Sequence, residues 1–322
     1  MNRNEQNPRS TALRPQLPTP AADGLLIIDK PEGWTSHDVV ARVRKIMKTR
    51  RVGHTGTLDP FATGVLVVCL NRATRLVQFL TGDDKEYVAT VRFGYATDTG
   101  DLTGTPLAPA ADARHIGKKQ VAEALAHFRG RILQTPPMYS AKKVGGVKLY
   151  EMARRGEEIE RQAVEVEISE LELVGETEGA SDLTRDIEFR VVCSSGTYIR
   201  TLAEDIGKHL GIGAHLVRLR RTRAGQCNIS QAVTPERLAE LAEAGAAEQL
   251  IIQMAEALAM PEVILNAADV VKAEHGNAIR FNGNWPAGTQ VKLLDERRQL
   301  FALAEYRPEN QTLQPRVVLI EK

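Results

Sequence analysis

The sequence is poor in cysteine and contains no long apolar run. Its three cysteines, Cys69, Cys193 and Cys227, lie far apart and show no CxxC spacing. This pattern argues against a disulfide framework and is typical of reduced thiols in a cytoplasmic protein. No apolar stretch approaches the roughly 20 residues that a membrane-spanning helix needs, and the polar, proline-rich start does not read as a secretory signal. The seven histidines show no zinc-ligand spacing, so we expect no metal.

A strong excess of charge of either sign is also missing. The formal net charge is only +1, which argues against a general nucleic-acid binder, because phosphate affinity comes from concentrated lysine and arginine. The basic residues are nevertheless clustered, and an acid-rich stretch at 157–188 cancels them in the total. The first basic cluster consists of Arg42, Arg44, Lys45, Lys48, Arg50 and Arg51, and the second basic cluster consists of Arg218, Arg220, Arg221 and Arg223. Each alone is compatible with a solvated face, whereas both together favour an RNA surface.

The chain is long enough, at 322 residues, to bury a sizeable core and to contain more than one domain. Residues 1–22 carry four prolines among Asn, Gln and Arg and predict a disordered arm. An apolar run at 24–28 predicts a short strand, followed by a helix with Ser36 as its N-cap. Apolar residues of that helix, from Val39 to Met47, fall on one face, and the arginines of the first basic cluster lie on the other.

The most informative stretch is the loop GHTGTLDPFATGVL at 53–66. Its glycines, threonines and Asp-Pro step predict a structured loop, and the apolar residues from Val65 to Leu70 predict a buried strand after it. Asp59 has no carboxylate neighbour within ten residues on either side. By itself Asp59 is therefore either a turn residue before proline or a nucleophile.

This loop resembles the catalytic motif of the TruB family of tRNA pseudouridine-55 synthases, and so do GLLIIDKPEGWTSHDVV at 24–40 and KEYVATVRFGYATDTGD at 85–101. The resemblance extends from Gly24 to about Arg223. It implies that Asp59 is the essential catalytic residue. It also implies that His54 helps to hold a loop from which a uridine has been flipped, although a lone histidine is more often structural.

Two further segments carry residues to which the resemblance assigns roles. Strict alternation from Tyr87 to Tyr95 predicts a strand with Tyr87 on its apolar face. The residues Cys193–Leu202 follow an alternating strand and lead into a helix, a junction that places side chains at the edge of a cleft. The resemblance implies that Tyr87 stacks on the target base and that Arg200 pairs with Asp59, with Tyr198 beside it. An adjacent guanidinium keeps a carboxylate ionised and directed.

The resemblance also assigns the remaining RNA contacts. Leu219 resembles an apolar residue that lines the floor of the pocket, and the basic residues around it, including Arg220, are expected to contact RNA. Arg50 and Arg51, which lead into the Asp59 loop, are expected to do the same.

The predicted fold is α/β in the α+β sense, with a mixed, mainly antiparallel pseudouridine-synthase sheet and flanking helices. After the alanine- and glutamate-rich helix that starts near Pro235, glycine-punctuated short strands predict a small C-terminal β-barrel that resembles a PUA-like domain. We therefore expect a catalytic domain at 23–255 and a PUA-like domain at 262–322.

The resemblance implies an enzyme that converts uridine 55 in the T loop of tRNA to pseudouridine without a cofactor, acting as a cytoplasmic monomer on the T-arm stem-loop. The target nucleotide leaves its stack, Asp59 acts on the ribose at C1′ or C2′, and uracil is rejoined through C5. Two alternatives stay open: an RNA-folding protein whose catalysis is incidental, and a nucleosidase or glycosidase. The second would need another carboxylate, such as Asp98 or Asp205.

Overall fold

The computed structural model describes residues 23–140, 143–144, 147–148, 152, 155, 157, 159–177, 181 and 183–319. The expected arm at 1–22 therefore lies outside the described residues. No helix in these ranges is long and apolar enough to cross a membrane.

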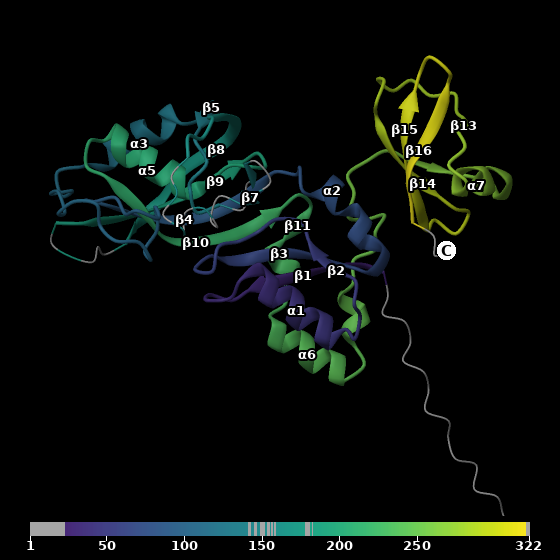
Figure 1. Cartoon of the computed structure of the whole chain (residues 1–322), viewed down its shortest axis with the longest axis horizontal. Helices are drawn as coiled ribbons and strands as arrows, with labels where there is room; N and C mark the ends of the chain where they lie inside the picture. Colours follow the sequence, from purple (N-terminus) through teal and green to yellow (C-terminus); the bar gives the residue numbers. More distant parts are fainter. Residues whose placement is uncertain are drawn as a thin grey trace, which may run out of the picture.

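A large sheet of nine strands forms the centre of the molecule, with the strand order β1-β3-β10-β4-β9-β8-β5, β2 beside β3 and β11 beside β10 (Figure 1). All neighbouring strands are antiparallel except β3 and β10. The strands are β1 (Gly24–Lys30), β2 (Val52–His54), β3 (Thr63–Leu70), β4 (Lys85–Phe93), β5 (Gly130–Gln134), β8 (Val164–Thr177), β9 (Arg185–Cys193), β10 (Ala214–Ala224) and β11 (Cys227–Asn228). A separate short hairpin pairs β6 (Lys143–Val144) with β7 (Val147–Lys148). The mixed, mainly antiparallel sheet that the sequence predicted is confirmed.

Helices cover the two halves of this sheet. The helices are α1 (Ser36–Ile46), α2 (Val77–Leu80), α3 (Lys118–His127), α5 (Ile199–His209), α6 (Pro235–Glu243) and α7 (Ala267–Glu274). Helices α1 and α6 lie along β1 and β3, whereas α3 and α5 lie over β4, β8 and β9 (Figure 1). Val39, Val43 and Met47 pack α1 onto the sheet as its periodicity predicted, and Arg44 and Lys45 on its other side are exposed.

The start of α1 differs from the prediction by one residue. Thr35, not Ser36, is the N-cap: its hydroxyl accepts a hydrogen bond from the Asp38 amide, and the Asp38 carboxylate accepts one from the Thr35 amide. This reciprocal capping box satisfies two amides at once. Ser36 is left free to bond elsewhere, and it bonds to the loop that contains Asp59.

A second sheet of five strands, in the order β12-β14-β15-β16-β13, forms the C-terminal part of the described chain together with α7 (Figure 1). These strands are β12 (Glu262–Ile264), β13 (Ile279–Arg280), β14 (Gln290–Leu294), β15 (Leu300–Arg307) and β16 (Thr312–Val318). The small β-rich region is thus confirmed, while the proposed boundaries at 255 and 262 stay a prediction. Leu294, Leu303 and Leu319 share a buried cluster with Leu25 and Ile27 of β1.

Candidate active site

Asp59 lies in a loop between β2 and β3 that is held on both sides of the carboxylate. The Ser36 hydroxyl accepts a hydrogen bond from the Leu58 amide at 2.9 Å and lies 3.2 Å from the Leu58 carbonyl oxygen. After Asp59, the Pro60 carbonyl accepts bonds from the Gly33 amide at 2.8 Å and from Lys30 Nζ at 3.1 Å. These contacts fix the backbone on either side of Asp59, so the direction of its side chain is set by the fold.

Lys30 is an unexpected part of this support. Its side chain is fully buried, and its ammonium donates to the carbonyls of Pro31, Trp34 and Pro60. Burial lowers the pKa of Lys30 to about 8, although the negative charge of Asp59 acts in the opposite direction. The sequence provided no signal for this role, because the three carbonyl partners come together only in the folded loop.

Arg200 stands directly behind Asp59. It occupies the first turn of α5, and its Nε lies 3.0 Å from Asp59 Oδ2. The same guanidinium donates to the Tyr139 carbonyl at 2.6 Å and to the Thr99 carbonyl at 3.0 Å. Only 7% of the Arg200 side chain is exposed, against 36% for Asp59. The pairing expected from the sequence is therefore present, and the carboxylate is the member of the pair that remains accessible.

A second carboxylate, Asp101, completes this group. Its Oδ2 lies 3.4 Å from Arg200 Nη1, and its side chain is buried. Its other oxygen accepts hydrogen bonds from the Thr103 amide and from the hydroxyls of Thr99 and Thr103. The sequence alone did not single out Asp101. The structure shows that it both organises its turn and contacts Arg200, a contact between positions 99 residues apart that no local pattern reveals.

The three groups act on one another electrostatically. Burial raises the pKa of Asp59; the charge of Arg200 opposes this shift, and the charge of Asp101 adds to it. Arg200 is thus the main influence that keeps Asp59 available in its ionised form.

Asp59 opens into a pocket of about 470 Å³. The residues that line it are Thr55, Gly56, Thr57, Leu58, Asp59, Thr81, Lys85, Tyr87, Ser140, Ser194, Ser195, Gly196, Thr197, Tyr198, Ile199, Arg200, Leu219 and Arg221. Strands β4 and β10, the Asp59 loop, the turn after β9 and the start of α5 thus contribute to one cavity. Asp59, Tyr87, Tyr198, Arg200 and Leu219, which the sequence analysis singled out, are all brought together here.

The walls of the pocket are well ordered by hydrogen bonds. The side chain of Gln134 accepts from the Tyr198 amide at 2.7 Å and donates to the Tyr198 carbonyl at 3.1 Å, which fixes the turn before α5. Tyr87 is buried on β4, and burial raises the pKa of its hydroxyl. Leu219 on β10 is also buried.

Four other predicted contacts do not line this pocket: His54, Arg50, Arg51 and Arg220. The Nδ1 atom of His54 accepts a bond from the Gly56 amide, a contact within its own loop. Arg50 and Arg51 are exposed. Arg220 forms an ion pair with Asp29 at 2.7 Å and so is held within the fold. Its role as an RNA contact stays a prediction, and its guanidinium is already paired with a carboxylate on β1.

Strand alternation also divides the second basic cluster. On β10, Arg218 is exposed, Leu219 and Arg221 are buried, and Arg220 lies between these extremes. Arg221 lines the pocket and lies two positions from Leu219. From the sequence it was only one member of the second basic cluster. The alternation of β10 could have identified it, since residues two apart on a strand share a face.

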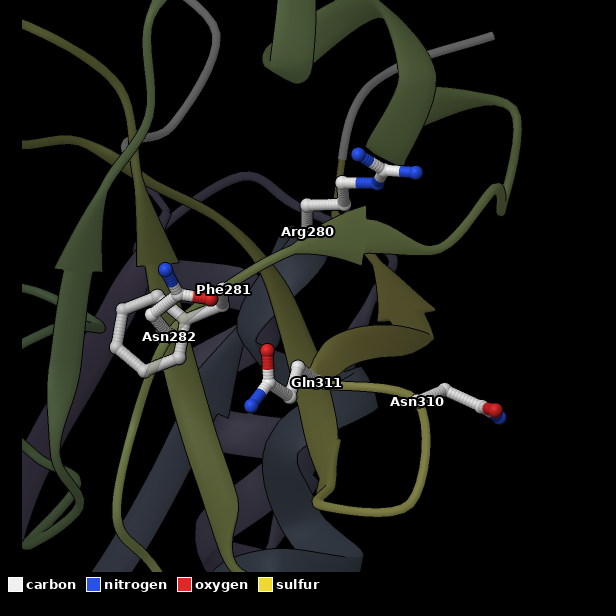
Figure 2. Close-up of a pocket in the computed structure, with 5 residues that line it drawn as sticks. All are labelled: Arg280, Phe281, Asn282, Asn310 and Gln311. Atoms are coloured by element: carbon white, nitrogen blue, oxygen red, sulfur yellow. The ribbon is translucent and has the colours of Figure 1, made fainter.

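A second pocket, of about 460 Å³, lies on the C-terminal sheet and is lined by Arg280, Phe281, Asn282, Asn310 and Gln311 (Figure 2). The ring of Phe281 stacks on Trp285, with centroids 4.9 Å apart. This pocket has neither a carboxylate nor a nucleophile in its lining. The described residues also contain no cluster of three or more His, Cys, Asp or Glu side chains that could hold a metal.

Comparison with known proteins places this geometry in a family. Residues 44–199 match the N-terminal domain of the TruB family pseudouridylate synthases, and residues 200–266 match the C-terminal domain of tRNA pseudouridylate synthase B. The tRNA pseudouridine synthase B of Geobacter sulfurreducens is 43% identical over 284 residues, which cover 84% of this chain and 90% of the relative. That of Thermobifida fusca is 44% identical over 290 residues, covering 89% and 95%. The chain belongs to the TruB family of pseudouridylate synthases.

Solved structures extend the likeness of this TruB family member to three dimensions. A chain of an H/ACA RNP bound to a substrate RNA containing 2′-deoxyuridine superimposes with a TM-score of 0.70 at 27% identity, covering 92% of this chain and 85% of the other. A chain of a Cbf5-Nop10-Gar1 complex gives a TM-score of 0.68 at 29% identity, with the same coverage. The fold is therefore shared with these two chains.

Proposed function

We propose that this protein converts uridine to pseudouridine in tRNA and that its target is uridine 55 of the T loop. Membership of the TruB family supports the reaction class. The observation that carries the assignment of Asp59 is its geometry: the carboxylate faces a pocket of about 470 Å³, and Arg200 holds it from behind at 3.0 Å. A pocket of this size suits a single flipped nucleoside.

The chemistry follows from this arrangement. A uridine within the stacked T loop is out of reach, so the nucleotide is flipped into the pocket, where Tyr87 and Leu219 contact its base. Asp59 then acts on the ribose, by adding to C1′ or by removing the C2′ proton, and the C1′–N1 bond breaks. The detached uracil turns and bonds to C1′ through C5, as Asp59 leaves C1′ or, in the other route, returns the proton to C2′. The C5 proton is lost last. No cofactor is required, because the leaving base is also the returning nucleophile.

The expected partner is the T-arm stem-loop of tRNA, bound by a monomer in the cytoplasm. The roles of His54, Tyr198, Arg50, Arg51 and Arg220 as RNA contacts and the division at residues 255 and 262 belong to this proposal. Sedimentation with and without a T-arm hairpin tests the stoichiometry. We expect one protein molecule per hairpin. Two protein molecules per hairpin would contradict the prediction of a monomer.

Tritium release from tRNA transcripts labelled at uridine C5 tests the reaction. Wild-type protein should release tritium, leave the RNA mass unchanged and release no free base. Asp59→Asn should lower the rate by on the order of 10⁴-fold or more, while Glu123→Gln on α3 serves as an exposed-carboxylate control. Release by Asp59→Asn at the wild-type rate would reduce Asp59 to a loop residue. Free uracil would instead indicate a nucleosidase, and tRNA binding without any release would indicate an RNA-folding protein.

A further inference from the structure

Two buried arginines line the pocket, and their partners differ in charge. Arg200 lies between the carboxylates of Asp59 and Asp101. Arg221, which is only 2% exposed, donates Nε to the Val65 carbonyl at 2.7 Å and Nη2 to the Gly56 carbonyl at 3.0 Å. Both of these acceptors are neutral. Within the described part of the chain, no carboxylate forms an ion pair with Arg221, so its positive charge stays uncompensated beside the cavity.

The position of Arg221 is fixed by the two strands that flank β10. It pairs with Tyr87 across β10 and β4 and with Gly64 across β10 and β3. Gly64 has a φ of +99°, and a Cβ there would lie 2.2 Å from the Arg221 carbonyl oxygen, so only glycine allows this approach. The charge of the guanidinium also opposes the burial that raises the pKa of Tyr87. Arg221 therefore adjoins Tyr87, the residue proposed to contact the base.

A buried guanidinium without a carboxylate is costly unless an anion joins it. Lys85, which also lines the pocket, adds to the local positive charge, and burial together with the charge of Arg221 lowers the pKa of its ammonium. The reaction itself generates an anion. When the C1′–N1 bond breaks, its electron pair remains on N1 of uracil, whether Asp59 has bonded to C1′ or has taken the C2′ proton.

We infer that Arg221 binds the detached uracil anion electrostatically and thereby stabilises the state in which the glycosidic bond is broken. This inference rests on the proposed function and deepens it. Arg200 orients Asp59, which acts on the ribose, whereas Arg221 stabilises the negative charge on the base. Its bonds to the Val65 and Gly56 carbonyls also keep the guanidinium at a constant place while the uracil turns. The negative charge persists until C5 bonds to C1′, after which the C5 proton leaves.

The test compares two RNAs on the same enzyme under single-turnover conditions. One T-arm RNA carries uridine at the target position and the other carries 5-fluorouridine, whose base is a better leaving group because fluorine stabilises the anion. Loss of the starting nucleoside is followed by chromatography of the digested RNA. The variants are Arg221→Met and Arg221→Lys. The control is Arg190→Met, an arginine of β9 paired with Glu86 and Glu170 outside the pocket lining.

Arg221→Met should lower the rate on uridine by about 100- to 1,000-fold, and the loss on 5-fluorouridine should be about tenfold smaller. Arg221→Lys should recover part of the rate because it restores the charge. RNA affinity should change by less than about threefold, as in the control. Equal losses on the two RNAs, or no loss at all, would overturn the inference. A folding defect lowers both rates alike, so it cannot produce the expected difference. Wild-type protein that leaves uridine unchanged would instead refute the proposed function.

Discussion

The guanidinium of Arg200 meets the carboxylate of Asp59 through two nitrogens, with Nε 3.0 Å from Oδ2 and Nη2 3.4 Å from Oδ1. The two residues are 141 positions apart in the chain. Two-point contact fixes the plane of the carboxylate as well as its charge. Arg200 therefore influences both the pKa of Asp59 and the orientation of its carboxylate, and the effect of each can be measured.

Replacing Arg200 with methionine should shift the pH dependence of the reaction. In the proposed mechanism ionised Asp59 is the active form, so the rate should fall as the pH drops below its pKa. Burial already raises this pKa, and Arg200 is the main influence that lowers it. Arg200→Met should therefore move the acidic limb of the pH–rate profile to higher pH. It should also lower the rate at neutral pH by on the order of 100-fold. Single-turnover rates across the acidic limb measure both effects, and a limb at the wild-type position would contradict the argument.

Replacing Asp101 with asparagine should shift the same limb in the opposite direction. The negative charge of Asp101 raises the pKa of Asp59, so its removal should lower that pKa. The rate should nevertheless fall by about 10- to 100-fold, because Arg200 loses a contact that orients it. Asp98→Asn is the matched control, since Asp98 accepts from the Thr105 amide in the same turn and has no ion pair to Arg200. Equal shifts in both variants would indicate a general loop effect.

Lys30 should make the stability of the protein depend on pH. Its pKa falls from 10.5 to about 8 on folding, so the unfolded chain binds more protons than the folded chain between these values. The free energy of unfolding of the wild type, relative to Lys30→Met, should therefore rise with pH through this window. Urea unfolding of both proteins across the window measures the difference. Parallel curves would show that the buried ammonium titrates as it does in the unfolded chain.

The two basic clusters should differ in their response to salt. If the exposed Arg50 and Arg51 contact phosphate, replacing both with alanine should reduce the slope of log affinity against log salt by about 1.5. Arg220→Met should leave the slope unchanged and instead lower stability by at most about 1 kcal/mol, because Asp29 loses a partly exposed partner. Filter binding of tRNA over a salt series, with thermal unfolding, separates these outcomes. A reduced slope for Arg220→Met would show that Arg220 contacts RNA phosphate.

Several parts of the fold and site could be predicted from the sequence because their signals are local. Apolar runs and alternation correctly predicted β1, β3, β4 and the buried face of α1. The dense motif around Asp59 pointed to the family, and the junction before α5 pointed to Tyr198 and Arg200. The cap of α1 was misplaced by one residue because Thr35 and Ser36 are both good capping residues. Only the reciprocal bond with Asp38 distinguishes them.

The sequence by itself determined the main elements and the family and singled out Asp59, since each depends on neighbouring residues and their periodicity. Only the tertiary structure decided which charges meet. It paired Arg220 with Asp29, placed Asp101 and Lys30 around the Asp59 loop and gave Arg221 no carboxylate partner among the described residues. The physical reason is that ion pairs act over a few ångströms in space, whereas their partners here lie 30 to 191 residues apart in the chain.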